Sequence, residues 1–338
     1  MRVAMLRRPG QVIIEEAPML VPGPGEVLIS VVYAGICGSD MHSFEGTHPF
    51  RHPPVVLGHE VSGTVAALGA GVTALQVGDA VTVMPFTYCG VCSQCRQGRP
   101  NTCLNKVVPG LRGWQGTFAD YFLSRADIVY PLGGVSLRRG VLAEPYAVGV
   151  HAVRRGLVGP DTHVLVLGGG SIGLFTTAAA HLAGAASVAV TDLYEHNLAL
   201  AVKMGAEHTY SAGDIDLVST VRRDYPEGFD VIYLTSAAKP VVKQAIALAR
   251  PGGRIVVVAL FAGEVPVVLS DLTVKELDLV GSQIYTHEDF RMALDHLVAG
   301  DLPYDDLITH ELPLVEAQQA MELMLRRDEP LVKALLCP

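Results

Sequence analysis

The sequence has few charged side chains, few cysteines and no excess of basic residues. Only 17% of its 338 residues are charged and 50% are hydrophobic, which excludes a mainly disordered chain. The formal net charge is −9 and no basic block occurs, so neither nucleic acid nor an anionic membrane is expected as the main partner. Six cysteines are too few to build a disulfide scaffold.

The chain also lacks an unbroken apolar segment of membrane-spanning character. Residues 162–191 hold no Asp, Glu, Lys or Arg, but two histidines and five glycines interrupt them, and their pattern is that of strand, helix and strand. Residues 1–9 contain Arg7 and Arg8 and lack the long apolar core of a secretion signal. We therefore expect a cytoplasmic protein, whose thiols stay reduced.

The pattern of the chain changes near residue 145, which, together with its length, predicts two domains of an α/β protein. Residues 85–116 hold four cysteines and little apolar pattern, so something other than a hydrophobic core must hold this lobe together. From Glu144 onward, apolar strands alternate with helices, which predicts a parallel sheet covered on both faces. Before that point, short strand-like segments divided by Gly and Pro predict a β-rich domain, with strands at 27–32, 55–57, 61–68 and 80–84.

A glycine-rich loop follows the predicted strand 163–167 and opens the predicted helix 172–182. The pattern G-x-G-x-x-G in this context is typical of a dinucleotide-binding loop. Its first glycine permits a tight turn, its second lets a pyrophosphate approach, its third allows close packing, and the start of the helix offers N–H groups to phosphate. The loop residues expected to bind cofactor are Gly168, Gly170, Ser171, Ile172 and Gly173.

The strand after this loop ends at Asp192, 19 residues beyond Gly173. A carboxylate at this point accepts hydrogen bonds from the adenine-ribose hydroxyls and repels a 2′-phosphate. No Arg or Lys follows Asp192 until Lys203. The sequence therefore predicts NAD rather than NADP as the cofactor.

Four cysteines, Cys89, Cys92, Cys95 and Cys103, share the spacing C-x2-C-x2-C-x7-C. Four thiolates this close in sequence can surround one ion tetrahedrally, which predicts a structural zinc site. An iron–sulfur cluster is the first alternative, although the bacterial ferredoxin pattern closes with a gap of three and then Pro. Here the last gap is seven and Leu104 follows. Disulfides are the second alternative, which a reducing cytosol disfavours, and thiols without metal are the third.

Four further residues, Cys37, His59, Glu60 and Glu144, are dispersed along the chain. Each has an ordinary structural explanation on its own, as a buried thiol, a solvated turn or a helix cap. Together they would supply one soft and three harder ligands to a single zinc ion that keeps an open position.

At these residues the sequence resembles the zinc-dependent medium-chain dehydrogenases, over essentially its whole length. The position of Glu144 carries Cys in alcohol dehydrogenases of the family, whereas a Glu there is similar to the polyol, threonine and butanediol dehydrogenases. The resemblance implies a GroES-like catalytic domain over 1–146 and 286–338, with its structural-zinc lobe at 85–116, and a Rossmann domain over 147–285. It rests on Gly35-Ile36-Cys37-Gly38-Ser39-Asp40-Met41-His42, Gly58-His59-Glu60, the four-cysteine lobe and Glu144-Pro145.

The resemblance also implies roles for these residues. Cys37 and His59 would bind a catalytic zinc, and Glu60 and Glu144 would lie beside it, either of them as a direct ligand. The zinc would act as a Lewis acid on an alcohol oxygen while hydride passes to the nicotinamide. Ser39 and then His42 would carry the hydroxyl proton to water, and Asp40 would hydrogen-bond His59. NAD and two zinc ions per chain are the expected cofactors.

The substrate is less well defined by the sequence. Polyol dehydrogenases of the family carry an Arg-Tyr pair where this chain has Ile284-Tyr285, so Tyr285 alone is kept as a substrate residue. We expect a small-molecule secondary alcohol within a polyol, sugar-derived or vicinal-diol substrate, with a 2-amino-3-hydroxy acid such as threonine as the alternative. A reductase without zinc and a non-catalytic dinucleotide sensor are alternatives from other classes. Four residues either line the substrate pocket or are ordinary loop residues: Arg51, Arg112, Trp114 and His287.

Two apolar segments late in the Rossmann domain, residues 265–269 and 277–281, predict a homo-oligomer, either a dimer or a tetramer. An edge strand in this region could pair with its copy across a two-fold axis. The alternative is that both segments are internal strands.

Overall fold

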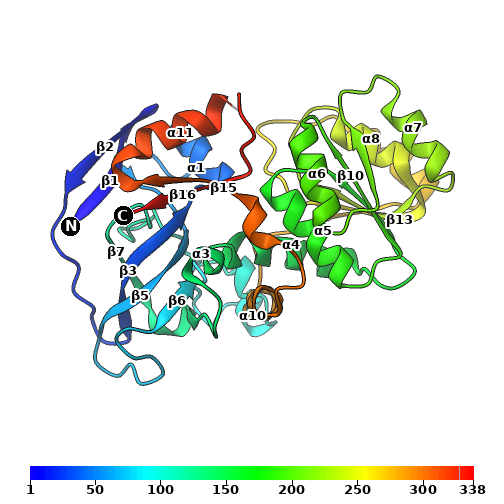
Figure 1. Ribbon diagram of the computed structural model, residues 1–338. Helices are drawn as coiled ribbons and strands as arrows, with labels where there is room; N and C mark the ends of the chain where they lie inside the picture. Colours follow the sequence, from blue (N-terminus) through cyan, green and yellow to red (C-terminus); the bar gives the residue numbers. More distant parts are fainter. Residues whose placement is uncertain (327) are drawn as a thin grey trace. The chain divides into compact units, whose positions relative to one another are not determined.

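The computed structural model describes residues 1–326 and 328–338 (Figure 1). The chain divides into two compact units. The first unit consists of Met1–Glu144 and Ala293–Pro338, and the second of Pro145–Met292. Within the described residues, every helix is too short or too polar to cross a membrane.

The first unit is built on a mixed seven-stranded sheet whose order is β15-β16-β3-β5-β6-β8, with β7 paired to β3. Its central strand, β3, is mostly buried and runs antiparallel to β5, with Gly35 opposite Glu60 at the end of the pair. The strands are β3 (Glu26–Gly35), β5 (Glu60–Leu68), β6 (Ala80–Val83), β7 (Tyr121–Arg125), β8 (Val129–Pro131), β15 (Ile308–Pro313) and β16 (Lys333–Cys337).

A smaller sheet of order β2-β1-β4 completes the strands of the first unit. Helix α11, which Figure 1 draws in red, contacts both β2 and β16. The remaining elements are β1 (Arg2–Arg8), β2 (Gln11–Glu16), β4 (Val55–Val56), α1 (Gly38–Phe44), α3 (Leu137–Gly140), η2 (Ala126–Ile128), η3 (Tyr304–Leu307), η4 (Leu314–Glu316) and α11 (Ala317–Arg326).

The cysteine-bearing lobe, residues 85–116, has little regular structure, as its sequence predicts. It contains one turn of helix, α2 (Ser93–Arg96), and a short 3-10 helix, η1 (Pro100–Thr102). Two isolated bridges, Thr87 to Val107 and Leu111 to Trp114, supply its strand pairing. A segment with so little regular structure depends on another source of stability.

The second unit is a six-stranded parallel sheet of order β11-β10-β9-β12-β13-β14. Consecutive residues of β9, β10 and β12 are buried, which means that both faces of these strands are covered. The chain leaves β9 toward one edge and returns to continue toward the other, as in a doubly wound fold. The strands are β9 (His163–Leu167), β10 (Ser187–Asp192), β11 (His208–Ser211), β12 (Phe229–Leu234), β13 (Ala249–Val257) and β14 (Asp278–Gly281).

The helices of the second unit alternate with its strands, which confirms the predicted α/β class. Helix α4 begins at Ala143, so Glu144 lies in its first turn. The helices are α4 (Ala143–Gly156), α5 (Ser171–Leu182), α6 (Glu195–Lys203), α7 (Leu217–Asp224), α8 (Val241–Leu248), α9 (Leu269–Lys275) and α10 (His287–Ala299). Of these, α4 begins and α10 ends in residues that belong to the first unit.

One predicted strand of the second unit is wrong. Residues 265–268 form no strand, and Leu269 begins α9. The segment 277–281 contains β14, which lies at the edge of the sheet beside β13. A short apolar segment can be either an edge strand or an irregular connection. Its residue pattern does not show whether it pairs with another strand.

A buried ion-pair cluster ties α4 to the first turn of α10 within the second unit. Asp289 accepts hydrogen bonds from Thr286 at the helix start, and its carboxylate lies 2.8 Å from both His151 Nδ1 and Arg154 Nη1. These interactions hold the pKa of Asp289 at about 2, although burial by itself would raise it. The cluster therefore stabilises the fold while Asp289 is ionised.

Candidate active site

Asp40 lies at the centre of the candidate site in the first unit. It is fully buried at the third position of α1, where its Oδ2 accepts a hydrogen bond from the backbone N–H of Cys37 (3.1 Å). Its Oδ1 accepts one from the backbone N–H of Gly58 (3.3 Å) and lies 3.5 Å from His59 Nδ1. One carboxylate thus holds together two segments that are separate in sequence, the one that carries Cys37 and the one that carries His59.

The charges of this cluster fix the protonation of His59. Burial alone would lower the pKa of His59, but the negative charges of Asp40 and Cys37 raise it well above its usual value. Burial would likewise raise the pKa of Asp40, and His59 and Arg51 hold it well below its usual range instead. Asp40 Oδ1, 3.5 Å from Nδ1, favours the neutral tautomer that carries its proton on Nδ1, and in that tautomer the lone pair of Nε2 can bind a metal.

The ligand atoms of Cys37, His59 and Glu60 all lie within 4.8 Å of one another. A thiolate, an imidazole and a carboxylate are the donor types that zinc prefers in catalytic sites, so these residues fit the ion that the sequence predicts. Cys37 and His59 are only partly buried, so each keeps some exposed surface. Glu144, the other candidate, is nearly fully buried, and its charge also acts on Lys333.

Glu60 is held by a lysine that sequence reasoning missed. Lys333 Nζ lies 2.7 Å and 2.8 Å from the two carboxylate oxygens of Glu60, and both side chains are almost wholly buried. Lys333 is on β16 and Glu60 on β5, with β3 between them. The carboxylate passes over Gly35 of β3, where an added Cβ would lie 1.9 Å from Glu60 Oε2. The available signal was a lysine in the apolar strand Lys333–Cys337, since a buried lysine needs a partner.

The predicted proton-path residues, Ser39 and His42, lie one turn apart on α1. Ser39 is half-buried, and its Oγ accepts a hydrogen bond of 2.8 Å from Arg51 Nη2. His42 is also half-buried, and its Nδ1 lies 3.4 Å from Thr47 Oγ1. The three-residue separation places both side chains on the same side of the helix.

The four cysteines of the lobe form a compact cluster of sulfur atoms. Their Sγ–Sγ distances are 4.0 Å (Cys89–Cys95), 3.5 Å (Cys92–Cys95), 3.9 Å (Cys92–Cys103) and 3.6 Å (Cys89–Cys103). A tetrahedral zinc with Zn–S bonds of about 2.3 Å needs sulfurs about 3.8 Å apart. Backbone N–H groups of Val91 and Cys92 lower the pKa of Cys89 to about 6, which favours a thiolate. The cluster fits a structural zinc ion.

The glycine loop of the second unit has the geometry that the sequence predicts for a phosphate-binding turn. Gly168 has a φ of 114°, which favours glycine, and an added Cβ on Gly173 would lie 1.8 Å from the carbonyl oxygen of Gly168. Gly170 precedes α5 and has open space where a Cβ would stand. Ser171 and Ile172 are the first two residues of the helix, so their N–H groups have no partner within it. The loop fits a dinucleotide pyrophosphate.

Asp192, at the end of β10, is already engaged with its surroundings. Its Oδ2 accepts a hydrogen bond from the N–H of Gly169 (2.7 Å), and its Oδ1 accepts from Tyr194 N and Asn197 Nδ2 (both 2.9 Å). A carboxylate accepts about four hydrogen bonds, so roughly one position is left for a ribose hydroxyl. Asn197, which the sequence analysis did not single out, orients the acid.

The residues considered for substrate contact differ in their burial and in their neighbours. Tyr285 is fully buried and packs against Phe290, with ring centroids 5.6 Å apart. Trp114 stacks on Phe122 and donates to the carbonyl of Leu123 (2.8 Å). Arg112 is exposed, His287 is half-buried, and Arg51 is buried and bound to protein groups. A contact of Tyr285 with substrate stays a prediction.

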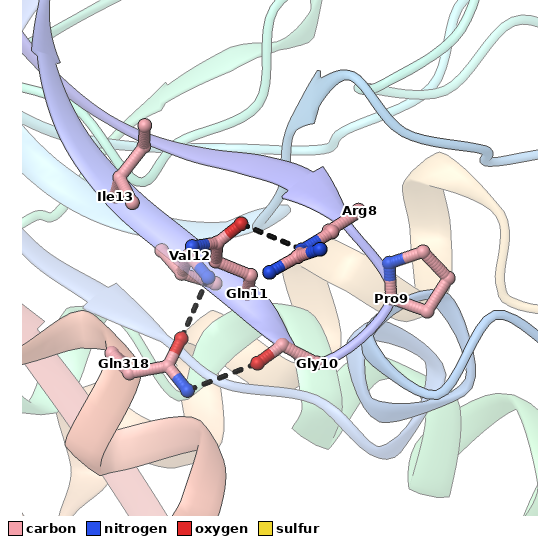
Figure 2. A pocket seen from close by; sticks show the side chains of 7 residues that line it. All are labelled: Arg8, Pro9, Gly10, Gln11, Val12, Ile13 and Gln318. Carbon is pink, nitrogen blue, oxygen red and sulfur yellow. Dashed lines mark hydrogen bonds between the residues drawn. The ribbon is translucent and has the colours of Figure 1, made fainter.

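A surface hollow of about 500 Å³ lies between the hairpin β1–β2 and α11 (Figure 2). Gln318 accepts a hydrogen bond from the N–H of Val12 (2.6 Å) and donates one to the carbonyl of Gly10 (3.1 Å). Arg8 donates to Gln11 (2.9 Å) in the same hollow. Its polar groups serve to attach the helix to the hairpin, so we assign it no catalytic role.

Known proteins resemble the chain over nearly its whole length. The family model of the alcohol dehydrogenase GroES-like domain matches residues 23–134, and that of the zinc-binding dehydrogenase matches residues 171–299. Sorbitol dehydrogenase of Bacillus subtilis is 32% identical over 346 residues, which cover 100% of this chain and 97% of the relative. Probable D-xylulose reductase A of Aspergillus clavatus is 34% identical over 308 residues, covering 88% and 86%.

A solved structure has the same fold. It is described as a short chain alcohol dehydrogenase from Escherichia coli CFT073 in complex with NADH. Its TM-score is 0.93 at 28% sequence identity, and the match covers 100% of this chain and 99% of that one. The likeness includes both the cysteine-bearing unit and the unit with the glycine loop, since no part of this chain is left out.

Proposed function

This chain belongs to the zinc-dependent medium-chain dehydrogenases, with a GroES-like and a Rossmann-type domain, and from that membership we propose its reaction. It oxidises a secondary alcohol within a polyol, sugar-derived or vicinal-diol substrate to the ketone, reversibly and with NAD. The observation that carries the proposal is the gathering of Cys37, His59 and Glu60 within 4.8 Å. Relatives named for sorbitol and xylulose support the substrate class.

Two zinc ions per chain are part of the proposal. Cys37 and His59, with Glu60 or Glu144 as the third protein ligand, would hold the catalytic ion, and the four cysteines of the lobe the structural one. A bound catalytic zinc supplies a Lewis acid to the alcohol oxygen. Elemental analysis of freshly purified protein should find two zinc ions per chain. One zinc would remove one of the two sites, and iron would overturn the assignment of the lobe.

The side chains on α1 would move the proton that alcohol oxidation releases. Ser39 accepts the hydroxyl proton and passes its own onward, and His42 delivers a proton to water. Neutral imidazole suits this role because its ordinary pKa is about 6.5. Asp40 binds neither substrate nor cofactor in this scheme. It positions Cys37 and His59 through the contacts described above.

NAD would lie on the glycine loop of the second unit. The backbone at Gly168, Gly170 and Gly173, with the helix start at Ser171 and Ile172, accommodates the pyrophosphate, and Asp192 accepts an adenine-ribose hydroxyl. The neighbours of Asp192, namely Gly169, Tyr194 and Asn197, carry no positive charge that would bind a 2′-phosphate. One structural neighbour is described in complex with NADH and another as bound to NADP, so they support a nicotinamide dinucleotide, and the choice of NAD depends on Asp192. Comparable kcat/KM values with NAD and NADP would contradict this choice.

We also propose domain bounds, a cellular location and an oligomeric state for the chain. The catalytic domain spans 1–146 and 286–338, the cofactor domain spans 147–285, and the protein acts in the cytoplasm on a small-molecule alcohol, without nucleic acid or membrane. It forms a homo-oligomer, a dimer or a tetramer, through the edge of β14. The support is the exposed apolar surface near that edge, at Val268, Leu269, Val274 and Leu279. Light scattering that shows a stable monomer at micromolar concentration would reject the assembly.

An NAD-reduction screen tests the reaction itself. Zinc-loaded protein is mixed with NAD and with polyols, sugar acids, cyclitols, vicinal diols and threonine in turn, and NADH formation is read by absorbance. We expect turnover with a polyol or diol and none after Cys37→Ser. A response to threonine alone would favour an amino-acid dehydrogenase. Bound NADH without turnover on any alcohol would favour a dinucleotide sensor.

A further inference from the structure

Arg51 is almost fully buried, with 5% of its surface exposed, and it has no role in the reaction proposed above. Its Nη1 lies 3.0 Å from Asp40 Oδ1 and its Nη2 donates to Ser39 Oγ at 2.8 Å. One guanidinium therefore joins the carboxylate that positions the metal ligands to the hydroxyl of the proton path. The planar fork of arginine can make both contacts at once, which a lysine ammonium cannot do with the same geometry.

His48 lies beside the guanidinium but does not accept a hydrogen bond from it. Nδ1 of His48 accepts hydrogen bonds from the backbone N–H groups of Phe50 (3.1 Å) and Arg51 (3.0 Å). Burial, together with the charge of Arg51, lowers the pKa of His48 to about 4, so the ring is neutral near pH 7. Its Nε2 must then carry the ring proton, and the approach of Arg51 Nε to within 3.3 Å is no true hydrogen bond. Asp40 and Ser39 are thus the groups that hold the guanidinium.

The contact with Ser39 limits what that hydroxyl can do. A serine hydroxyl has one proton to donate and two lone pairs that accept. Arg51 Nη2 donates to one lone pair, and it remains a donor at every relevant pH because a guanidinium stays protonated in proteins. One lone pair remains for an incoming alcohol hydroxyl, and the proton of Ser39 must point away from the guanidinium, toward a third group.

We propose that Arg51 is a positioning residue that gives the proton path through Ser39 a single direction. The inference rests on the dehydrogenase function proposed above. In the step, the O–H bond of the substrate breaks as a new O–H bond forms at Ser39 Oγ. The original Oγ–H bond breaks at the same time, and its proton passes to the next acceptor, so Ser39 ends neutral. Arg51 accepts no proton, and its charge stabilises the partial negative charge that develops on Oγ.

The test compares Arg51→Met and Arg51→Lys with the unchanged enzyme and with Arg7→Met as a matched control. Arg7 is an exposed residue of β1 that pairs with Glu15 of β2, and within the described residues it makes no hydrogen bond or ion pair with Asp40, Ser39 or Arg51. For each protein, zinc content, melting temperature and NADH affinity are measured first. The rate of the first NADH turnover is then measured in H2O and in D2O, with zinc-loaded protein only.

For Arg51→Met we expect the first turnover to slow by about tenfold to a hundredfold, the lower range for one acid–base contribution. The solvent isotope effect on that turnover should increase, because proton transfer becomes the slow step. NADH affinity should stay within a factor of two of the unchanged enzyme. Arg51→Lys keeps the charge but not the fork, and should slow the reaction less. Arg7→Met should change none of these values.

Other outcomes overturn the inference in distinguishable ways. If zinc-loaded Arg51→Met keeps the normal rate and isotope effect, Arg51 has no part in the proton path. If rate and melting temperature fall together while the isotope effect stays constant, the role of Arg51 is structural only. If Arg51→Met does not fold, the same criteria apply to Arg51→Lys. An unchanged enzyme that forms no NADH from any alcohol refutes both this inference and the proposed function.

Discussion

Replacing Lys333 by methionine should destabilise the first unit far more than replacing an exposed lysine. Lys333 and Glu60 form an ion pair with side-chain exposures of 3% and 0%, and the ammonium also donates to the carbonyl of Ile36 (3.2 Å). Methionine has a similar length but no charge, so the substitution leaves the carboxylate of Glu60 buried without its counter-ion. Breaking one side of such a pair costs about 3–5 kcal/mol.

The size of the effect on melting can be worked out from the size of the unit. For a domain of 150–250 residues, each kcal/mol shifts the melting temperature by about 2–4 °C. The Lys333→Met variant should therefore melt roughly 6–20 °C below the unchanged protein. Calorimetry in the presence of zinc and again in the presence of a chelator measures this shift. Lys243→Met, at an exposed position of α8, is the control and should melt within about 1–2 °C of the unchanged protein.

A double-mutant cycle with Glu60→Gln separates the ion pair from general damage to packing. The two single changes should each destabilise, while the double change should cost less than their sum by about 2–3 kcal/mol. Additive costs would refute the reasoning, since they would mean that the two charges do not depend on each other. A loss as small as that of the exposed control would refute it as well.

Three further predictions follow from single contacts. Gly35→Ala places a Cβ 1.9 Å from Glu60 Oε2, so it should lower zinc retention during chelator competition, and unchanged retention would show that the carboxylate has room to move. Asp289→Asn should remove about 2 kcal/mol of stability near neutral pH. Because the pKa of Asp289 is lowered from 3.8 to about 2, this stability is present above about pH 4 and is lost as the pH falls toward 2, so urea midpoints of the two proteins should converge there. Cys95→Ser should release one zinc ion and expose residues 85–116 to protease while the second unit melts normally, and full zinc retention would contradict the four-sulfur site.

Local patterns in the sequence were sufficient for the glycine loop and the cysteine lobe. Gly168 and Gly173 act through a turn and a close approach that the neighbouring residues define, and the four cysteines lie within one short segment. The parallel sheet of the second unit was predictable for a similar reason, because strands buried on both faces are recognisable from their own residues.

The partners of the charged groups were not predictable in the same way. Arg51 lies in the loop between α1 and β4, and its charge suggested a residue that lines a substrate pocket. In the structure it is buried against Asp40 and Ser39. Lys333 binds Glu60 from 273 residues away. Which distant side chain neutralises a buried charge depends on strand order, and the order β16-β3-β5 cannot be derived from hydrophobic period alone.

The strand order of the first unit also has a consequence for protein synthesis. Glu60 leaves the ribosome 273 residues before its counter-ion Lys333, an interval of roughly 14 to 55 seconds at about 5–20 residues per second. Until Lys333 is made, burial would leave the carboxylate of Glu60 without its counter-ion, which opposes closure of the first unit over Glu60. The second unit, a continuous segment from Pro145 to Met292, has all its strands available before β16 is made. In the nascent chain all strands of the second unit are therefore present while the first unit still lacks β16, the strand that carries Lys333.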